Sequence, residues 1–321
     1  MIKISTPQGV NIEDIAENHY DCLKQKLLKR IKRKRTDTPD DSQKQFLNDN
    51  LYEILTAHPK RLQELQEEAF DEYDFKEPTD DIPIALVSIF DYQDFTKKKV
   101  DEYDAYDLSE SLGINVCPYC NLNFTHTVKQ GDVKIARPDF DHFFPKSKFP
   151  LLSLSFYNLI PCCGICNSNI KKDKVLSLKE DWHPYLDLIS NKMIIDYEPR
   201  TLPAIYGLDG KNLKIKIYPK PDTSDDIKTK IKNTVDMFKL EERYDLHADY
   251  ASEILLKQYH TSGSYLQSLK DAFVSAGFTE AELHRIAFAN YHEIDGFDKR
   301  PLSKLTFDFV KKQDWGEIKY E

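Results

Sequence analysis

Two Cys-x-x-Cys pairs enclose an Asp-His dipeptide, and this order of residues is the part of the sequence best suited to chemistry. The first pair is Cys117 and Cys120, and the second is Cys163 and Cys166. Four thiolates complete the tetrahedral shell of a Zn²⁺ ion and leave no open position for a substrate. We therefore expect one structural zinc ion. Cys162 directly precedes Cys163, so either can be the ligand, although the usual spacing favours Cys163.

Side chains with oxygen and imidazole groups accompany these pairs. Asp141 offers a carboxylate and Asn167 an amide oxygen, and both are ligands that Mg²⁺ or Mn²⁺ prefers over zinc. Neighbouring side chains on a strand point to opposite faces, so Asp141 can face a cation while His142 faces a water molecule. A neutral imidazole near pH 7 can take a proton from that water. Asn169, two residues further on, is an alternative to Asn167.

These residues carry a resemblance to a known family. The order Asp141-His142, Asn158 and Asn167 resembles the HNH nucleases, which have the ββα-metal fold. A further resemblance is to HNH subunits of bacterial anti-phage systems, including the PtuB-like nuclease of Septu. It is carried by the segments FDHFFPKS and YNLIPCCGICN and by a following lysine. The HNH resemblance covers roughly residues 115–175.

The resemblance implies a role for each motif residue. His142 would be the general base, Asp141 and Asn167 would bind one Mg²⁺ or Mn²⁺ ion, and Asn158 would hold the loop between the strands through backbone hydrogen bonds. It also implies a metal-dependent endonuclease that hydrolyses DNA, as the effector of a defence system with an ATPase partner. The alternatives are an RNase of the same fold, for example one that cleaves tRNA, and a non-catalytic zinc knuckle that binds nucleic acid.

Lysines near the motif are candidates for binding substrate phosphates. Lys146 and Lys148 follow Pro145 in the loop after the first motif strand, and Lys171 and Lys172 follow Asn167 on the expected helix. The alternative is that they are ordinary solvated lysines.

Short elements must position these side chains. We expect strands at 140–144 and 158–161 and a helix at 164–172, preceded by a hairpin that pairs 124–128 with 133–135. A unit this small buries little apolar surface, which explains a stabilising zinc ion.

The rest of the chain has mostly helical patterns, so we expect an α+β protein that is predominantly helical. The expected regions are 1–112, mainly helical, 113–195, the HNH module, and 196–321, a hairpin at about 203–218 followed by helices. Cys22 lies on the helical pattern of 11–35 and is expected in its core. The motif Thr279 to Glu282 predicts a capping box.

Composition and charge constrain the function further. The chain carries a formal net charge of −9, yet residues 116–180 and 1–35 are locally basic. The basic tail of the helix at 11–35 follows a phosphate backbone, is a solvated helix end, or is salt-bridged to the acidic region 63–81. An acidic protein has weak bulk attraction for nucleic acid, so a partner is expected to deliver it. No P-loop motif is present, so any ATPase activity comes from that partner. Reduced, metal-binding cysteines and the absence of a long apolar run predict a cytoplasmic protein without a membrane span.

Overall fold

The computed structural model describes residues 1–7, 9–33, 39–75, 84–260, 264–291 and 293–312. Over these residues the chain is mixed α and β, dominated by helices, with three two-stranded antiparallel sheets. It divides into two compact units, each built from distant segments of the sequence. The N-terminal unit contains Ser5–Ile114 and Thr125–Leu178, and the C-terminal unit contains Met1–Ile4, Asn115–Phe124 and Lys179–Glu321.

This division differs from the expected boundaries. Residues 113–195 do not form a unit of their own, because residues 125–178 belong with the helices that precede them. The physical reason is packing: helices α1 (Ile12–Lys32), α3 (Leu51–Thr56) and α5 (Ile84–Ile89) contact the short helical turns between the two motif strands. A two-stranded sheet alone is marginally stable in water, so the helices supply its core.

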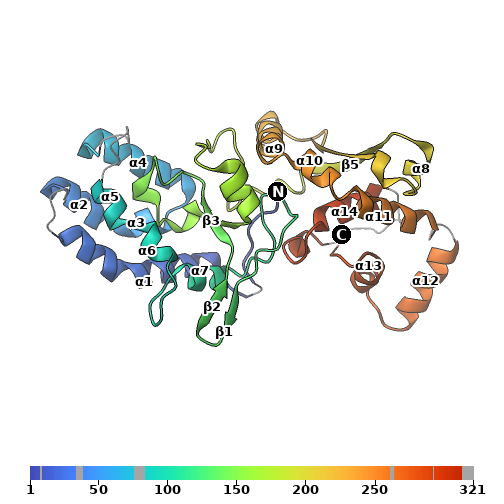
Figure 1. Cartoon of the computed structure of the whole chain (residues 1–321), viewed down its shortest axis with the longest axis horizontal. Coiled ribbons are helices and arrows are strands. Elements are labelled where there is room, and N and C mark those ends of the chain that lie inside the picture. The colour runs from blue at the N-terminus through green and yellow to red at the C-terminus, as the bar shows by residue number, and fades with distance from the viewer. Residues whose placement is uncertain (8, 34–38, 76–83, 261–263, 292, 313–321) are drawn as a thin grey trace. The chain divides into compact units, whose positions relative to one another are not determined.

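The helices of the N-terminal unit lie beside the motif strands (Figure 1). They are α1 (Ile12–Lys32), α2 (Asp41–Asp49), α3 (Leu51–Thr56), α4 (Pro59–Tyr73), α5 (Ile84–Ile89), α6 (Tyr92–Thr96) and α7 (Ala105–Leu112). Side-chain caps mark where several of these helices begin. Asp40 forms a capping box with Gln43 at α2, and Asp104 forms one with Asp107 at α7.

Helix α1 buries one face against the unit. His19, Leu23, Leu27 and Ile31 follow one another at intervals of four residues and are all buried. Cys22 lies beside this stripe and is exposed, so the expectation of a core thiol was wrong.

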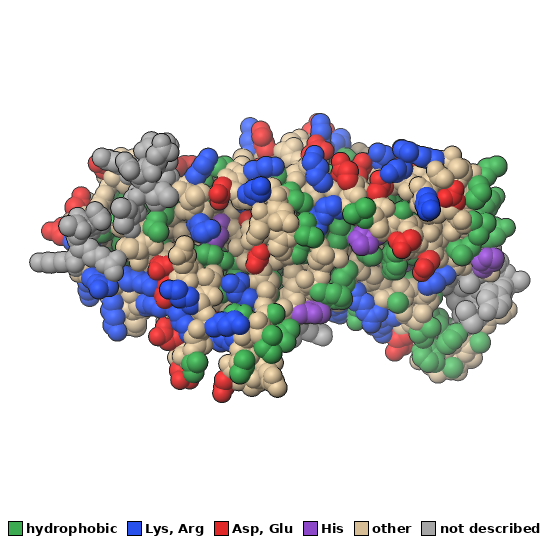
Figure 2. Space-filling view, viewed as in Figure 1, with side chains coloured by type: hydrophobic (Ala, Val, Ile, Leu, Met, Phe, Trp, Pro, Cys, Tyr) green, Lys and Arg blue, Asp and Glu red, His purple; other side chains and the backbone are tan. Residues whose placement is uncertain are grey.

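The basic tail of α1 is partly neutralised. Lys26 and Arg30 pair with Asp94 of α6 at 2.6 and 2.8 Å, so salt bridges form, but with a different partner from the expected region 63–81. Figure 2 shows Lys and Arg side chains gathered along α1.

The strands of the N-terminal unit form two hairpins. Strands β1 (Val128–Gln130) and β2 (Val133–Ala136) pair across a turn in which Gly131 has a positive φ of 58°. Strands β3 (Asp139–His142) and β4 (Leu159–Cys162) pair around a longer connection, which contains the 3₁₀ turns η1 (Pro150–Leu152) and η2 (Phe156–Asn158). The π-helix η3 (Ile165–Lys171) follows β4. Two strands and one helical segment therefore occur in the expected order.

The C-terminal unit contains a hairpin of its own. Strand β5 (Met193–Pro199) pairs with β6 (Leu213–Pro219) in register from Met193 opposite Pro219 to Pro199 opposite Leu213. The expected first strand, near residue 203, is instead the short helix α8 (Leu202–Ile205), because Thr201 caps it and Pro203 fits its first turn.

The remaining elements of the C-terminal unit are helical. They are η4 (Gly210–Asn212), α9 (Asp225–Phe238), α10 (Leu240–Asp245), α11 (Ala248–His260), α12 (Ser264–Ser275), α13 (Glu280–Phe288), η5 (Ile294–Gly296) and α14 (Ser303–Lys312). The predicted capping box of Thr279 and Glu282 is confirmed at the start of α13. None of the described helices is both long and apolar enough to cross a membrane.

Candidate functional site

Four cysteine thiols converge in the structure. The sulfur atoms of Cys117, Cys120, Cys163 and Cys166 all lie within 4.8 Å of one another. A zinc ion that binds four thiolates at about 2.3 Å holds the sulfur atoms about 3.8 Å apart, so this spacing fits a tetrahedral site. The four cysteines can therefore hold a structural metal ion such as zinc.

Cys163, not Cys162, is the member of this cluster, which decides the alternative that the sequence left open. Cys162 is the last residue of β4 and is fully buried. Burial, aided by the nearby Asp141 carboxylate, raises the pKa of the Cys162 thiol well above its usual value. That thiol therefore stays protonated and packs as a small apolar group.

The turn after Cys117 is built to accept a thiolate. The backbone N–H of Leu122 and the side-chain amide of Asn123 donate to the sulfur of Cys120 at 3.4 and 3.8 Å. The Cys117 N–H donates to the carbonyl of Asn123 at 2.9 Å and closes the turn. Donors to sulfur stabilise its negative charge and orient it for a metal.

The β3–β4 hairpin presents the Asp-His dipeptide. Asp141 lies opposite Ile160 and His142 lies opposite Leu159. Asn158 stands just before β4 and is fully buried. Its side-chain oxygen accepts from the Phe144 N–H at 2.7 Å, and its amide donates to the carbonyls of Phe144 and Leu152 at 3.1 and 2.9 Å. These backbone bonds hold the loop as expected from the sequence, while a part for Asn158 in catalysis stays a prediction.

Successive carbonyl groups of the same loop bind two buried imidazoles. The Ser153 carbonyl lies 2.9 Å from Nε2 of His142, and the Leu154 carbonyl lies 2.8 Å from Nε2 of His19 on α1. Together with the bonds of Asn158, these contacts fix the loop from both sides. The loop therefore orients His142 as a rigid support.

The hydrogen bond to Ser153 determines the tautomer of His142. A carbonyl oxygen only accepts, so Nε2 carries the proton and the lone pair is on Nδ1. Burial lowers the pKa of His142 to about 3, and the positive charges of Lys146 and Lys171 add to this effect. The Tyr92 ring packs edge-on against the imidazole, with ring centroids 4.5 Å apart. His142 is thus a neutral, fixed imidazole with one nitrogen able to accept a proton.

Lys171 occupies a different place from the one expected. It is fully buried, and its Nζ lies 3.1 Å from Oδ1 of Asp141 and donates to the His142 carbonyl at 2.6 Å. The expectation of a phosphate-binding lysine at this position was wrong, because the ammonium is enclosed and held by an equally buried carboxylate. Lys171 instead fixes the side chain of Asp141 and the backbone of His142.

The π-helical geometry of η3 accompanies this arrangement. The Lys172 N–H donates to the Asn167 carbonyl at 2.9 Å, five residues earlier, where the sequence had predicted an ordinary helix. Such widened turns are rare among helices, and many of those that do occur lie at functional sites.

Asp139 is a candidate residue that the sequence reasoning missed. Its Oδ2 lies 3.4 Å from the side-chain amide nitrogen of Asn167 and 3.5 Å from the hydroxyl of Ser168. Because the Asn167 nitrogen donates to Asp139, the Asn167 oxygen is the atom left to bind a cation. The available signal was strand periodicity, which places Asp139 on the same face as Asp141.

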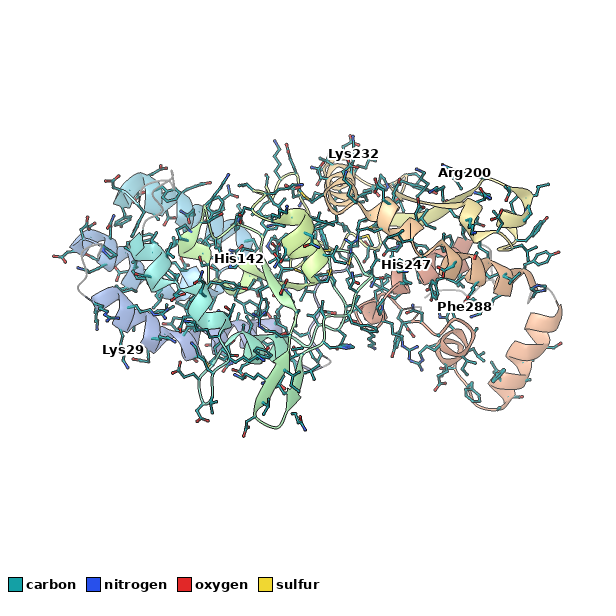
Figure 3. All side chains as sticks on the ribbon, viewed as in Figure 1. Lys29, His142, Arg200, Lys232, His247 and Phe288 are labelled. Atoms are coloured by element: carbon teal, nitrogen blue, oxygen red, sulfur yellow. The ribbon has the colours of Figure 1, made fainter. Side chains whose placement is uncertain are left out.

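Most of the candidate residues line one open cavity. It has a volume of about 520 Å³, and its lining includes Asp139, Asp141, His142 and Asn167. Figure 3 labels His142 beside β3, among the helices of the N-terminal unit. Oxygen groups and a neutral imidazole therefore share one solvent-accessible space.

The other lysines expected to bind phosphate differ in whether they line the cavity. Lys146 and Lys172 are exposed and line the cavity, whereas Lys148 is exposed and does not line it. Nζ of Lys146 lies 5.5 Å from the centre of the Tyr92 ring. Asn169 is exposed and does not line the cavity, which favours Asn167 over the alternative ligand.

The donor set fits a hard divalent cation. The carboxylates of Asp139 and Asp141 and the amide oxygen of Asn167 are among the groups that line the cavity, and such oxygen ligands suit Mg²⁺ or Mn²⁺. Comparisons with protein-family models, curated proteins and solved structures find no match to this chain. Its function is therefore inferred from the geometry of the site.

Proposed function

We propose that this protein is a metal-dependent endonuclease of the HNH type that hydrolyses phosphodiester bonds of DNA. The observation that carries the proposal is the shared cavity of His142, Asp139, Asp141 and Asn167, with the lone pair of His142 assigned to Nδ1. A general base beside oxygen ligands for a divalent cation is what hydrolysis of a phosphodiester requires.

In this proposal, Nδ1 of His142 takes the proton from an attacking water molecule. The pKa of about 3 makes the free imidazole a weak base. A phosphate that enters the cavity brings negative charge next to the ring and raises this pKa toward neutrality. The Ser153 carbonyl holds Nε2–H and stabilises the imidazolium that forms.

Asp139, Asp141 and Asn167 would hold a Mg²⁺ or Mn²⁺ ion, which when bound supplies electrostatic stabilisation of the developing charge on phosphorus and on the leaving oxygen. Asn167 is oriented by Asp139, and Asp141 by Lys171. Lys146 and Lys172 at the cavity attract the anionic substrate.

We also propose that zinc on the four cysteines is structural. Four sulfur ligands leave no coordination position for a water molecule. In zinc-finger peptides such an ion supplies on the order of 10 kcal/mol of folding free energy, so it stabilises the fold rather than taking part in catalysis.

The test is a cleavage assay on supercoiled plasmid with Mg²⁺ or Mn²⁺. The wild-type chain should nick or cut the plasmid, and His142→Ala should lose at least about a hundredfold in rate while its melting temperature and zinc content stay near the wild-type values. His126→Ala is the matched control, since this histidine is exposed and does not line the cavity. If His142→Ala cuts as fast as wild type, the assignment is wrong.

The same assay with total RNA tests the choice of substrate. Cleavage of RNA with an intact plasmid would replace the DNA proposal by the RNase alternative, and binding without any cleavage would favour a zinc-knuckle module. We also propose an ATPase partner in anti-phage defence, motivated by the net charge of −9 and the missing P-loop. Plasmid cleavage that is unchanged by a co-purified partner and ATP would count against it.

A further inference from the structure

Arg137 is a cation of the cavity to which neither the motif nor the proposed reaction gives a role. It lies between β2 and β3, directly after Ala136, and is half-buried. It lines the same cavity as Asp141 and His142. A cationic side chain at this position meets whatever ligand the cavity binds.

The guanidinium of Arg137 is held in place by aromatic rings. Its central carbon lies 5.6 Å from the centre of the Tyr106 ring and 5.8 Å from that of Phe140. Nη1 donates to the Pro138 carbonyl at 2.6 Å. Stacking on aromatic faces leaves the edge of the guanidinium plane, with its N–H donors, available to an anion.

The charge of Arg137 has no acidic partner within the described part of the chain, where no carboxylate lies within ion-pair distance of it. The nearby lysines of the β1–β2 hairpin differ: Lys129 pairs with Asp107 and Glu110, and Lys134 with Asp104 and Asp107. A fixed, partly desolvated arginine without a carboxylate partner is prepared to bind an anion from solution.

Phosphate is the anion that fits this geometry best. An arginine fork matches two oxygens of a phosphate, and the cavity also contains exposed lysines at positions 146 and 172. The open shape of the cavity suits an extended polymer. We propose that Arg137 binds a backbone phosphate of the nucleic-acid strand that occupies the cavity. The choice of this occupant rests on the proposed function.

The experiment measures binding separately from cleavage. A fluorescent DNA duplex is titrated with wild type and with Arg137→Ala at several salt concentrations, in buffer without added Mg²⁺ or Mn²⁺ and without a chelator, so that zinc on the four cysteines is retained. Arg137→Ala should bind about tenfold more weakly, and the slope of log affinity against log salt should decrease by about one. Arg137→Lys keeps the charge without the fork and should give an intermediate affinity.

Lys98→Ala is the matched control. The Lys98 ammonium lies 5.7 Å from the centre of the same Tyr106 ring, but this residue is exposed and does not line the cavity. Its removal should change the affinity less than twofold. Equal weakening by Lys98→Ala, or unchanged binding by Arg137→Ala, would overturn the proposal. If Arg137→Ala does not fold, as judged by its melting curve, the salt slope of Arg137→Gln decides instead.

Failure of this inference is distinguishable from failure of the proposed function. A wild-type chain that cleaves plasmid with Mg²⁺ while Arg137→Ala binds normally would refute only the role of Arg137. A wild-type chain that binds DNA through Arg137 but never cleaves nucleic acid would refute only the nuclease.

Discussion

The buried pair of Lys171 and Asp141 gives the sharpest prediction. Lys171→Met removes the ammonium but keeps most of the volume and the apolar stem. The side chains of Lys171 and Asp141 are 0% and 2% exposed, so the Asp141 carboxylate is left buried without its partner. The His142 carbonyl loses its donor in the same step.

The expected cost follows from this enclosure. Removal of one partner of a buried ion pair costs about 3–5 kcal/mol of folding free energy, because the other charge stays desolvated. For a protein of this size class, each kcal/mol shifts the melting temperature by about 2–4 °C. We therefore expect Lys171→Met to melt roughly 6–20 °C lower than wild type.

The assay is thermal unfolding monitored by circular dichroism, first without added divalent cation and without a chelator, and then with added Mn²⁺. Asp141→Asn, added to Lys171→Met, removes the negative charge that has lost its partner and should recover about 1–3 kcal/mol of folding free energy. Mn²⁺ should raise the melting temperature of Lys171→Met more than that of wild type, since the ion can neutralise the stranded carboxylate.

Two results would refute this reasoning. The first is a melting temperature for Lys171→Met within about one degree of wild type, which would mean that the pair is not enclosed as described. The second is a double variant no more stable than Lys171→Met, which would mean that the stranded carboxylate is not the source of the loss.

The other predictions address the buried histidine, the cysteines and the new ligand candidate. Burial lowers the pKa of His19 from 6.5 to about 4, so the unfolded chain binds this proton at higher pH than the folded chain. The stability due to neutral His19 is therefore complete above pH 6.5 and decreases by about 1.4 kcal/mol per pH unit toward pH 4. In urea titrations across this range, His19→Gln should reduce the pH slope by that amount, and an unchanged slope would contradict it. Cys163→Ser should lose the zinc ion measured by mass spectrometry while Cys162→Ser keeps it, and the reverse outcome would reassign the ligand. Asp139→Asn should weaken Mn²⁺ binding about 10–100-fold in an electron paramagnetic resonance titration. Asp132→Asn, in the exposed β1–β2 turn, should not weaken it, and equal affinity of both variants would exclude Asp139 from the site.

Local patterns predicted the individual elements well. The apolar stripe of α1, the capping box at Thr279 and the cluster of four cysteines were all readable from residues close together in the sequence. Such features depend on helical periodicity, on a cap three residues away or on ligand spacing, so near neighbours suffice to specify them.

The first strand of the β5–β6 hairpin was harder to predict. Residues 203–208 are largely apolar and precede the Asp209-Gly210 turn signal, but Thr201 caps a helix there, and the partner of β6 is the segment at 193–199. A turn signal beside apolar residues does not specify which of two nearby segments pairs with a strand, because the choice depends on what each segment packs against.

The sequence by itself determined which chemical groups this protein brings: four thiolates, an Asp-His dipeptide and two asparagines in a fixed order. Only the tertiary structure decided what each group touches. It buried Lys171 against Asp141, turned Asn167 toward Asp139 and fixed the proton of His142 through Ser153. These partners are 11 to 30 residues apart, and their contact depends on how the β3–β4 loop and η3 fold back on the strands. A side chain's type sets what it can bind, but its charge state and its availability are set by the groups that enclose it.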